Sequence, residues 1–167
     1  MTPLPGDTGP AHFWRLDDKR YAKKWDSGDG SRLKGGRWSP AGVPAVYCSL
    51  DPATAILELA VHKGFDTLNA VAHVLSAATL AIPWAQVHVV HPKDVPNKLW
   101  LYPCALSAAQ QGFGRRLLSV HDFIAIPSAV SRRSWNLVFD ANRAAGKYAL
   151  QCQEALDLDP RLNPPRR

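Results

Sequence analysis

The stretch from residue 35 to residue 58 constrains the fold of this chain more than any other. It begins with Gly35-Gly36, a pair that allows positive φ angles or a close approach of the backbone to a ligand. Residues 40–44 hold two prolines and a glycine, which predicts a turn. Residues 45–48, Ala-Val-Tyr-Cys, are apolar and β-prone. They predict a short buried strand directly after the turn.

A helix is predicted over residues 51–63. Asp51-Pro52 has the form of a helix start, with Asp as the N-cap and Pro at the first helical position. Between Pro52 and Val61 the only charged residue is Glu58. A helix that is apolar nearly all round is usually buried. A buried carboxylate is unfavourable unless it is paired or hydrogen-bonded, so Glu58 should have a partner.

Arg37 is the partner that the sequence suggests for Glu58, because it lies on the preceding β element. Such a pair has two interpretations. Buried ion pairs are often purely structural, and carboxylates in unusual surroundings also gather at functional sites. Spacing alone does not decide between them.

Composition indicates a single globular domain with anionic partners. The chain has 167 residues, of which 46% are hydrophobic and 20% charged. The net charge of +6 favours phosphates, nucleotides, nucleic acid or an acidic protein. Its positive residues occur in scattered pairs, as expected for a solvated surface. Three widely spaced cysteines and six histidines form no metal-binding pattern. With no signal peptide and no membrane-spanning stretch, we expect a cytoplasmic protein.

The remaining segments predict short strands and a few helices. We expect these elements, in chain order: a strand at 12–16, a short helix and then a mobile loop within 17–34, strands at 70–75 and 81–90, a helix within 103–118 interrupted by two glycines, strands at 121–127 and 136–140, and a short helix or final strand within 141–155. Regular βαβ alternation is missing. We therefore predict an α+β domain with a central mixed or mostly antiparallel sheet, with the 51–63 helix packed on it.

Two motifs resemble the RES domain family, which is named for an Arg, a Glu and a Ser. The first is Gly-Gly-Arg-Trp-Ser-Pro-Ala-Gly from residue 35, followed by Tyr47 and, eleven residues later, Glu58. The second is Pro-Ser-Ala-Val at 127–130, which makes Ser128 the match for the family's serine. By its residues alone, a serine after proline would more simply cap its own backbone. Residues 136–140 resemble the family's next strand, although Asp-Ala replaces its usual closing Asn-Pro.

The resemblance covers residues 12–162, which we take as the RES domain between a flexible N-terminus, 1–11, and a flexible tail, 163–167. It implies an ADP-ribosyltransferase-like fold and consumption of NAD. No Gly-x-Gly-x-x-Gly is present, so NAD is expected as substrate and no bound cofactor or metal is expected.

The resemblance also implies roles for particular residues. Glu58 would stabilise the oxocarbenium-like transition state, and Ser128 would position a ribose or phosphate oxygen or the acceptor. Arginine binds phosphates with a planar fork of donors, which suits Arg37 with support from Arg15. Tyr47 would contact the nicotinamide end, or be a core tyrosine with a satisfied hydroxyl. Gly36 and Trp38, which flank Arg37, complete the expected NAD contacts.

The expected function is therefore that of the toxin of a bacterial toxin–antitoxin pair, which cleaves or transfers ADP-ribose from NAD and arrests growth by depleting it. The acceptor, whether water, phosphate or a protein side chain, is left open, so a protein ADP-ribosyltransferase is an alternative. A ribonuclease or RNA-binding toxin, and a non-enzymatic binding module, are further alternatives. The family implies a helix-turn-helix, Xre-like antitoxin as partner, and a homodimer is also considered. Neither membrane binding nor direct nucleic-acid binding is expected.

Overall fold

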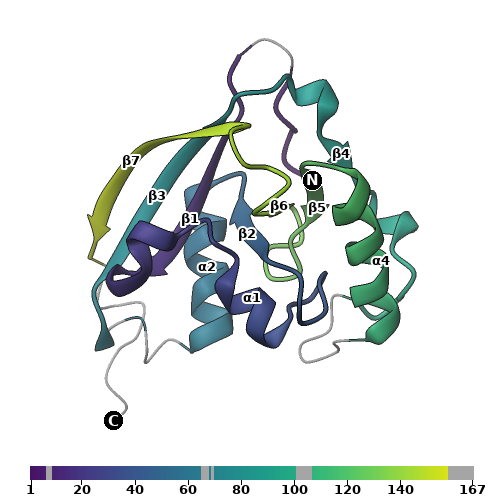
Figure 1. The fold of residues 1–167 in the computed structure, drawn as a ribbon, viewed down its shortest axis with the longest axis horizontal. Coiled ribbons are helices and arrows are strands. Elements are labelled where there is room, and N and C mark those ends of the chain that lie inside the picture. Colours follow the sequence, from purple (N-terminus) through teal and green to yellow (C-terminus); the bar gives the residue numbers. More distant parts are fainter. Residues whose placement is uncertain (7–8, 65–67, 69, 101–106, 158–167) are drawn as a thin grey trace.

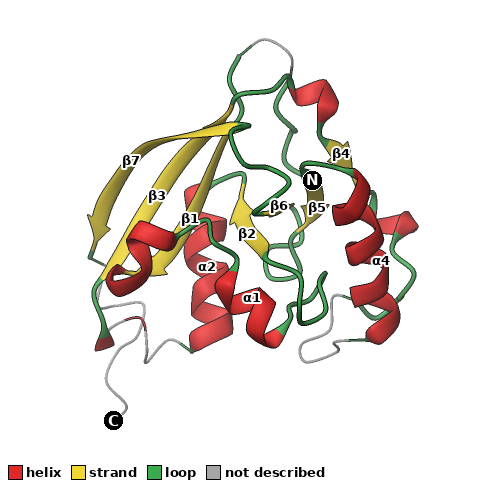
Figure 2. Ribbon diagram, viewed as in Figure 1, coloured by secondary structure: helices red, strands yellow, loops and turns green. Residues whose placement is uncertain are grey.

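A computed structural model shows one seven-stranded sheet with helices packed beside it (Figures 1 and 2). The structure describes residues 1–6, 9–64, 68, 70–100 and 107–157. The strands are β1 His12–Asp18, β2 Ala45–Ser49, β3 His73–Leu80, β4 His88–Val89, β5 Ile124–Pro127, β6 Trp135–Asp140 and β7 Tyr148–Leu156. The α-helices are α1 Asp29–Lys34, α2 Pro52–Lys63 and α4 Ala108–Val120, and the 3₁₀ helices are η1 Lys19–Lys24, η2 Trp84–Gln86 and η3 Pro92–Asp94.

The strand order is β4-β5-β6-β2-β1-β3-β7. Only β4 and β5 pair in parallel, and every other neighbouring pair is antiparallel. The predicted α+β domain with a mixed, mostly antiparallel sheet is confirmed.

The sheet is almost divided between β1 and β2. These strands pair at one position only, Trp14 with Ser49. By contrast, β1 pairs with β3 over all seven of its residues, and β2 pairs with β6 over all five. One half of the sheet is therefore β1-β3-β7 and the other is β2-β6-β5-β4, as Figure 1 shows.

Three apolar clusters pack the sheet and its helices together. The largest cluster, which includes Phe13, Phe123 and Phe139, joins the two halves. A second cluster contains Trp38, Trp100 and Leu118 and lies under α4. A small third cluster, which includes Leu16, Ala55 and Leu75, holds α2 against β1 and β3.

Local sequence explains α2 well. The Asp51 carboxylate accepts a hydrogen bond from the Thr54 amide at 2.7 Å, and Pro52 occupies the first turn. Gly64 follows the helix with φ of 83°, a value that favours glycine. The expectation of a helix buried all round was wrong: Leu57 is 36% and Val61 58% exposed, because only one face of α2 contacts the sheet.

Several predicted elements differ in extent from those observed. Residues 29–34 form α1 where a mobile loop was expected, and the strand expected at 70–75 is β3, at 73–80. The strand expected at 81–90 shrinks to the two residues of β4, because η2 occupies residues 84–86. Helix α4 runs through both glycines that were expected to interrupt it. The alternatives for 141–155 resolve into the strand β7.

The ends of the chain were expected to be flexible. Near the N-terminus, the Thr2 amide donates to the Arg133 carbonyl, and the Trp135 indole donates to the Thr2 carbonyl at 3.0 Å. The tail at 163–167 lies outside the described residues. Of the helices that are described, none has both the length and the hydropathy needed to cross a membrane.

Candidate active site

Glu58 lies half-buried on α2, where two neutral side chains hold one of its oxygens. Its Oε1 accepts hydrogen bonds from the Ser128 hydroxyl at 2.7 Å and from the Asn136 amide at 2.6 Å. Ser128 follows β5 and Asn136 lies on β6, so the fold joins residues 70 and 78 positions apart. The described residues supply no hydrogen bond to Oε2, which leaves this oxygen available to a ligand.

Asn136 is itself held in one orientation. Its side-chain oxygen accepts a hydrogen bond from the Ser49 hydroxyl at 2.9 Å, while its amide nitrogen donates to Glu58. Ser49 and Asn136 are register partners on β2 and β6, and both are buried. The hydrogen bonds from Ser49 to Asn136 and from Asn136 to Glu58 therefore fix the carboxylate to strands β2 and β6.

Ser128 caps its own turn, as its residues alone suggested, and it also holds the Glu58 carboxylate; the substrate-positioning role that the resemblance implies stays a prediction. It is fully buried, and its oxygen accepts hydrogen bonds from the amides of Val130 and Ser131 at 3.1 and 2.9 Å. Its hydroxyl proton is donated to Glu58. The serine thus caps its own turn and anchors the candidate carboxylate.

Arg37 does not pair with Glu58, so that prediction was wrong. Its guanidinium donates to the Trp100 carbonyl. Within the described residues, neither Arg37 nor Glu58 takes part in an ion pair. Ser128 and Asn136 hold Oε1 of the carboxylate with neutral donors, and the Arg37 guanidinium bonds the Trp100 carbonyl instead.

Tyr47, Gly36 and Trp38 form a packed unit next to Arg37. The Tyr47 hydroxyl accepts a hydrogen bond from the Trp38 amide at 3.1 Å and bonds the Ser39 hydroxyl at 2.9 Å. Burial raises the pKa of Tyr47, so its phenol stays neutral. A Cβ at Gly36 would lie 2.6 Å from the Tyr47 oxygen, so this glycine is needed for the packing. Trp38 is buried against Trp100. The structure thus favours the reading of Tyr47 as a core tyrosine.

Arg15 spans the division between β1 and β2. Its guanidinium forms an ion pair with Asp17 at 2.9 Å and donates to the Tyr47 carbonyl at 2.8 Å. Burial acts to lower the pKa of Arg15, but the attraction and hydrogen bond of Asp17, together with the charges of Cys48 and Asp26, raise it more, so the net pKa is raised. The bond to Tyr47 therefore joins β1 to β2, while the pair with Asp17 lies within β1.

His62 lies one helical turn after Glu58 on α2. Burial is the main cause that lowers the pKa of His62, and the positive charges of Lys63 and Arg15 lower it further. The negative charge of Glu58 acts to raise it. These four groups therefore lie within electrostatic range of one another. His62 borders the site and stays neutral near pH 7.

Sequence reasoning missed Asn136, Ser49 and His62. A signal existed for Asn136, since it is the one polar residue among the buried positions of β6. His62 also had a signal, because positions four apart on a helix share a face. Ser49 gave no signal, as its role depends on the pairing of β2 with β6.

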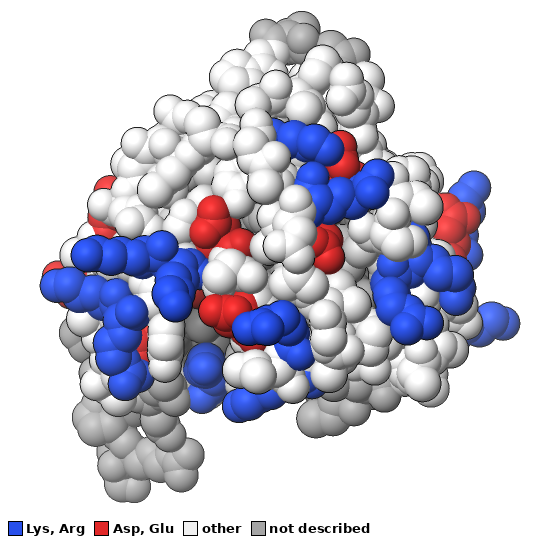
Figure 3. Space-filling model, in the orientation of Figure 1, with Lys and Arg blue, Asp and Glu red and all other residues white. Residues whose placement is uncertain are grey.

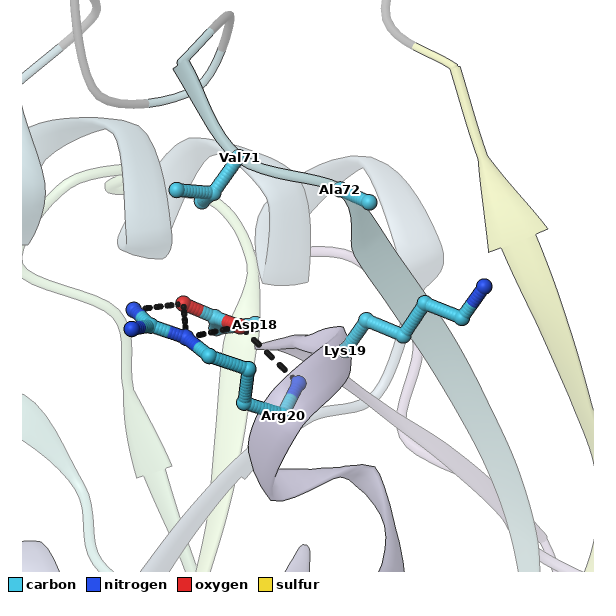
Figure 4. A pocket seen from close by; sticks show the side chains of 5 residues that line it. All are labelled: Asp18, Lys19, Arg20, Val71 and Ala72. Carbon is cyan, nitrogen blue, oxygen red and sulfur yellow. Dashed lines mark hydrogen bonds and ion pairs between the residues drawn. The ribbon is translucent and has the colours of Figure 1, made fainter.

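A shallow depression of about 440 Å³ lies elsewhere, between η1 and the start of β3 (Figure 4). It is lined by Asp18, Lys19, Arg20, Val71 and Ala72. Hydrogen bonds from Arg20 lower the pKa of Asp18 to about 2, and the two side chains pair at 2.6 Å. None of the candidate site residues lines this depression, and its arginine is already neutralised, so we do not assign it to the site.

Positive side chains on the face drawn in Figure 3 form several separate groups with acidic ones between them. No continuous basic track of the kind that binds a nucleic-acid backbone crosses this face. The positive side chains are thus scattered over this face.

Comparisons with known proteins agree with the motifs. The family profile described as the RES domain matches residues 12–159. The chain is 30% identical over 132 residues to a protein named Toxin Res from Photorhabdus laumondii, a match that covers 77% of this chain and 80% of that protein. It is 42% identical over 86 residues to the Prs ADP-ribosylating toxin of a Sphingobium species, over 50% of this chain and 53% of that toxin.

The fold is also found in a solved structure, that of the M. tuberculosis MbcT–MbcA toxin–antitoxin complex. The TM-score is 0.68, with 89% of this chain and 85% of the other covered, at 17% sequence identity. This likeness shows that the two proteins share a fold. With a family match over nearly its whole length, the chain belongs to the RES domain family.

Proposed function

We propose that this protein is the toxin of a toxin–antitoxin pair and that it breaks the bond between ribose C1′ and the nicotinamide nitrogen of NAD. One observation carries the proposal. Glu58 is a half-buried carboxylate with one oxygen anchored by Ser128 and Asn136, and no described cation neutralises it. Its charge is therefore available to a ligand.

This arrangement suits the chemistry of NAD cleavage. The C1′–N bond breaks with its electron pair going to the pyridinium nitrogen, so nicotinamide leaves as a neutral molecule without a general acid. Positive charge develops on the ribose, as in glycoside hydrolysis. A preorganised carboxylate stabilises that charge and costs no reorganisation during the reaction. The acceptor oxygen then bonds C1′ and releases its proton.

Arg37 is the main candidate for binding the pyrophosphate. It is half-buried, and within the described part of the chain its side chain makes one hydrogen bond, to a backbone carbonyl, which leaves further donors of the guanidinium for a ligand. Arginine presents parallel donors that match phosphate oxygens. Arg15 would contribute further positive charge, although Asp17 offsets part of it.

Transfer of ADP-ribose to a protein is the second candidate for the outcome. The similarity to a protein named Prs ADP-ribosylating toxin favours it. Water as acceptor would give ADP-ribose, and phosphate would give ADP-ribose 1″-phosphate.

Product analysis tests the proposal and separates these outcomes. Purified protein is incubated with NAD, with and without phosphate, and the products are identified by mass spectrometry. We expect release of nicotinamide that depends on Glu58. Intact NAD under all conditions, together with degradation of added RNA, would favour the ribonuclease alternative; intact NAD and intact RNA would favour a binding module.

We also propose a helix-turn-helix antitoxin as the partner and the cytoplasm, which holds the NAD pool, as the site of action. Support comes from the family and from a structural neighbour that is a toxin–antitoxin complex. The net charge of +6 suits an acidic inhibitor. Co-expression of the adjacent reading frame should restore growth; persistent arrest beside a stable, soluble neighbour product would contradict the pairing.

A further inference from the structure

Strand β7 is an open edge of the sheet. Within the described part of the chain only β3 pairs with it, and it stands last in the strand order. Residues 149–155 are all exposed, and Figure 1 shows the strand along one side of the molecule. An open edge strand presents unpaired backbone N–H and C=O groups that can pair with another strand.

The strand lacks most of the features by which proteins prevent an exposed edge strand from pairing with another chain. It is nine residues long, contains neither lysine nor proline, and has Glu154 as its one charged residue. Leu150 is 45% exposed, and an alanine stands next to the last residue at each end of the strand. One irregularity is present, a register shift that leaves Gln151 without a partner on β3.

The sequence of β7 is nearly symmetric about its centre. Tyr-Ala-Leu-Gln-Cys-Gln-Glu-Ala-Leu has Cys152 in the middle, a glutamine on each side, an alanine three residues away in both directions and an apolar residue at each end. Antiparallel pairing of two such strands about a two-fold axis at Cys152 would place Gln151 opposite Gln153 and Ala149 opposite Ala155. Leu150 of each copy would lie opposite Glu154 of the other. The two Glu154 side chains would be about 14 Å apart along the strands.

We propose that β7 is a self-association edge, where a second copy of this chain pairs antiparallel about Cys152 to continue the sheet across a two-fold axis. Closed two-fold interfaces use the same surface on both copies, which a symmetric strand provides. Edge pairing of this kind supplies backbone hydrogen bonds. Because the contact is small, we expect a concentration-dependent dimer.

Disulfide trapping tests the register directly. Cys48 is buried and Cys152 is exposed. Cys104 lies outside the described residues, so all variants carry Cys104→Ser. In the proposed register the two Cys152 Cα atoms are within the range that a disulfide spans. Mild oxidation with copper–phenanthroline should therefore yield a covalent dimer of twice 18.3 kDa.

The matched control is Leu150→Cys with Cys152→Ser, a thiol at another exposed position of β7 whose two copies would lie about 14 Å apart. We expect Cys152 to cross-link at least about tenfold faster, since the control distance is too long for a disulfide. In addition, Ala149→Cys and Ala155→Cys, each with Cys152→Ser, should cross-link when mixed and not when alone.

A solution measurement completes the test. Cys152→Lys places two like charges opposite each other on the axis and should shift sedimentation toward the monomer, whereas Cys152→Ser should not. Equal cross-linking rates for Cys152 and the Leu150→Cys control would overturn the proposal. So would a monomer at all concentrations, which would assign a protective role to the register shift at Gln151.

Discussion

At the residue scale, the environment of Glu58 determines what its carboxylate can do. A partner such as arginine would have compensated its charge, whereas Ser128 and Asn136 orient it and leave the charge uncompensated. Uncharged donors to one oxygen therefore position the carboxylate without competing with a developing cation. Asn136 is the more informative of the two donors, because its own orientation is set by Ser49.

Asn136→Asp should change the pH dependence of NAD cleavage. It places a second carboxylate beside Glu58, and two carboxylates that share a site titrate as a coupled pair with one pKa raised. The acid limb of the kcat profile should move up by about one pH unit or more. Asn136→Ala should instead lower kcat about tenfold with little change in KM, since only positioning is lost. Superimposable pH profiles for wild type and Asn136→Asp would exclude the positioning role.

Arg37→Lys should weaken NAD use although the charge is kept. A lysine can reach the Trp100 carbonyl but cannot present two parallel donors to a pyrophosphate. We expect kcat/KM to fall about tenfold or more, at a nearly unchanged melting temperature. Steady-state kinetics and thermal unfolding on one preparation measure both. Equal activity in the two proteins would mean that Arg37 contributes only its positive charge or has a structural role.

At the element scale, α4 shows how packing overrides helix propensity. Gly112 and Gly114 both lie inside it, yet the helix is continuous from Ala108 to Val120. Gly114 is buried against the backbone of Trp38, so a side chain there would occupy the space of the Trp38 carbonyl oxygen. The nearest atom that a Cβ at Gly112 would meet is the end of Arg116, 3.7 Å away.

These two glycines give a matched pair of substitutions. Gly114→Ala should destabilise the protein by about 1–3 kcal/mol, because α4 must move away from the segment that carries Arg37. Gly112→Ala should stabilise it by about 0.5–1 kcal/mol through helix propensity alone. Urea unfolding of both variants checks the signs. A Gly114→Ala protein as stable as Gly112→Ala would mean that the close contact with Trp38 is not needed.

Elements with local signals were predicted well from the sequence. The N-cap Asp51, the first-turn Pro52 and Gly64 defined α2 within a residue. The interruption expected in α4 failed because the reason for Gly114 is a contact with Trp38, 76 positions away. The strand expected at 81–90 failed for a similar reason, since β4 exists only where it meets β5.

At the scale of the whole molecule, topology assembles the site. Ser49, Glu58, Ser128 and Asn136 come from β2, α2, the end of β5 and β6, and the pairing of β6 with both β5 and β2 brings them together. Motif resemblance identified Glu58 and Ser128. Spacing in the sequence did not reveal that these two residues are in direct contact, because the contact depends on long-range strand pairing. For the same reason it did not reveal that Arg37 and Glu58 form no ion pair within the described residues.

Glu58→Gln examines the proposed role of Glu58 as the catalytic carboxylate of NAD cleavage. Glutamine keeps the volume and accepts the hydrogen bonds of Ser128 and Asn136 through its oxygen, but it lacks the negative charge. Nicotinamide release and thermal unfolding are measured on the same preparation. We predict a loss of about two to three orders of magnitude in turnover with nearly unchanged melting. Retained turnover per folded molecule, with lowered melting, would contradict the account and leave Glu58 a structural residue.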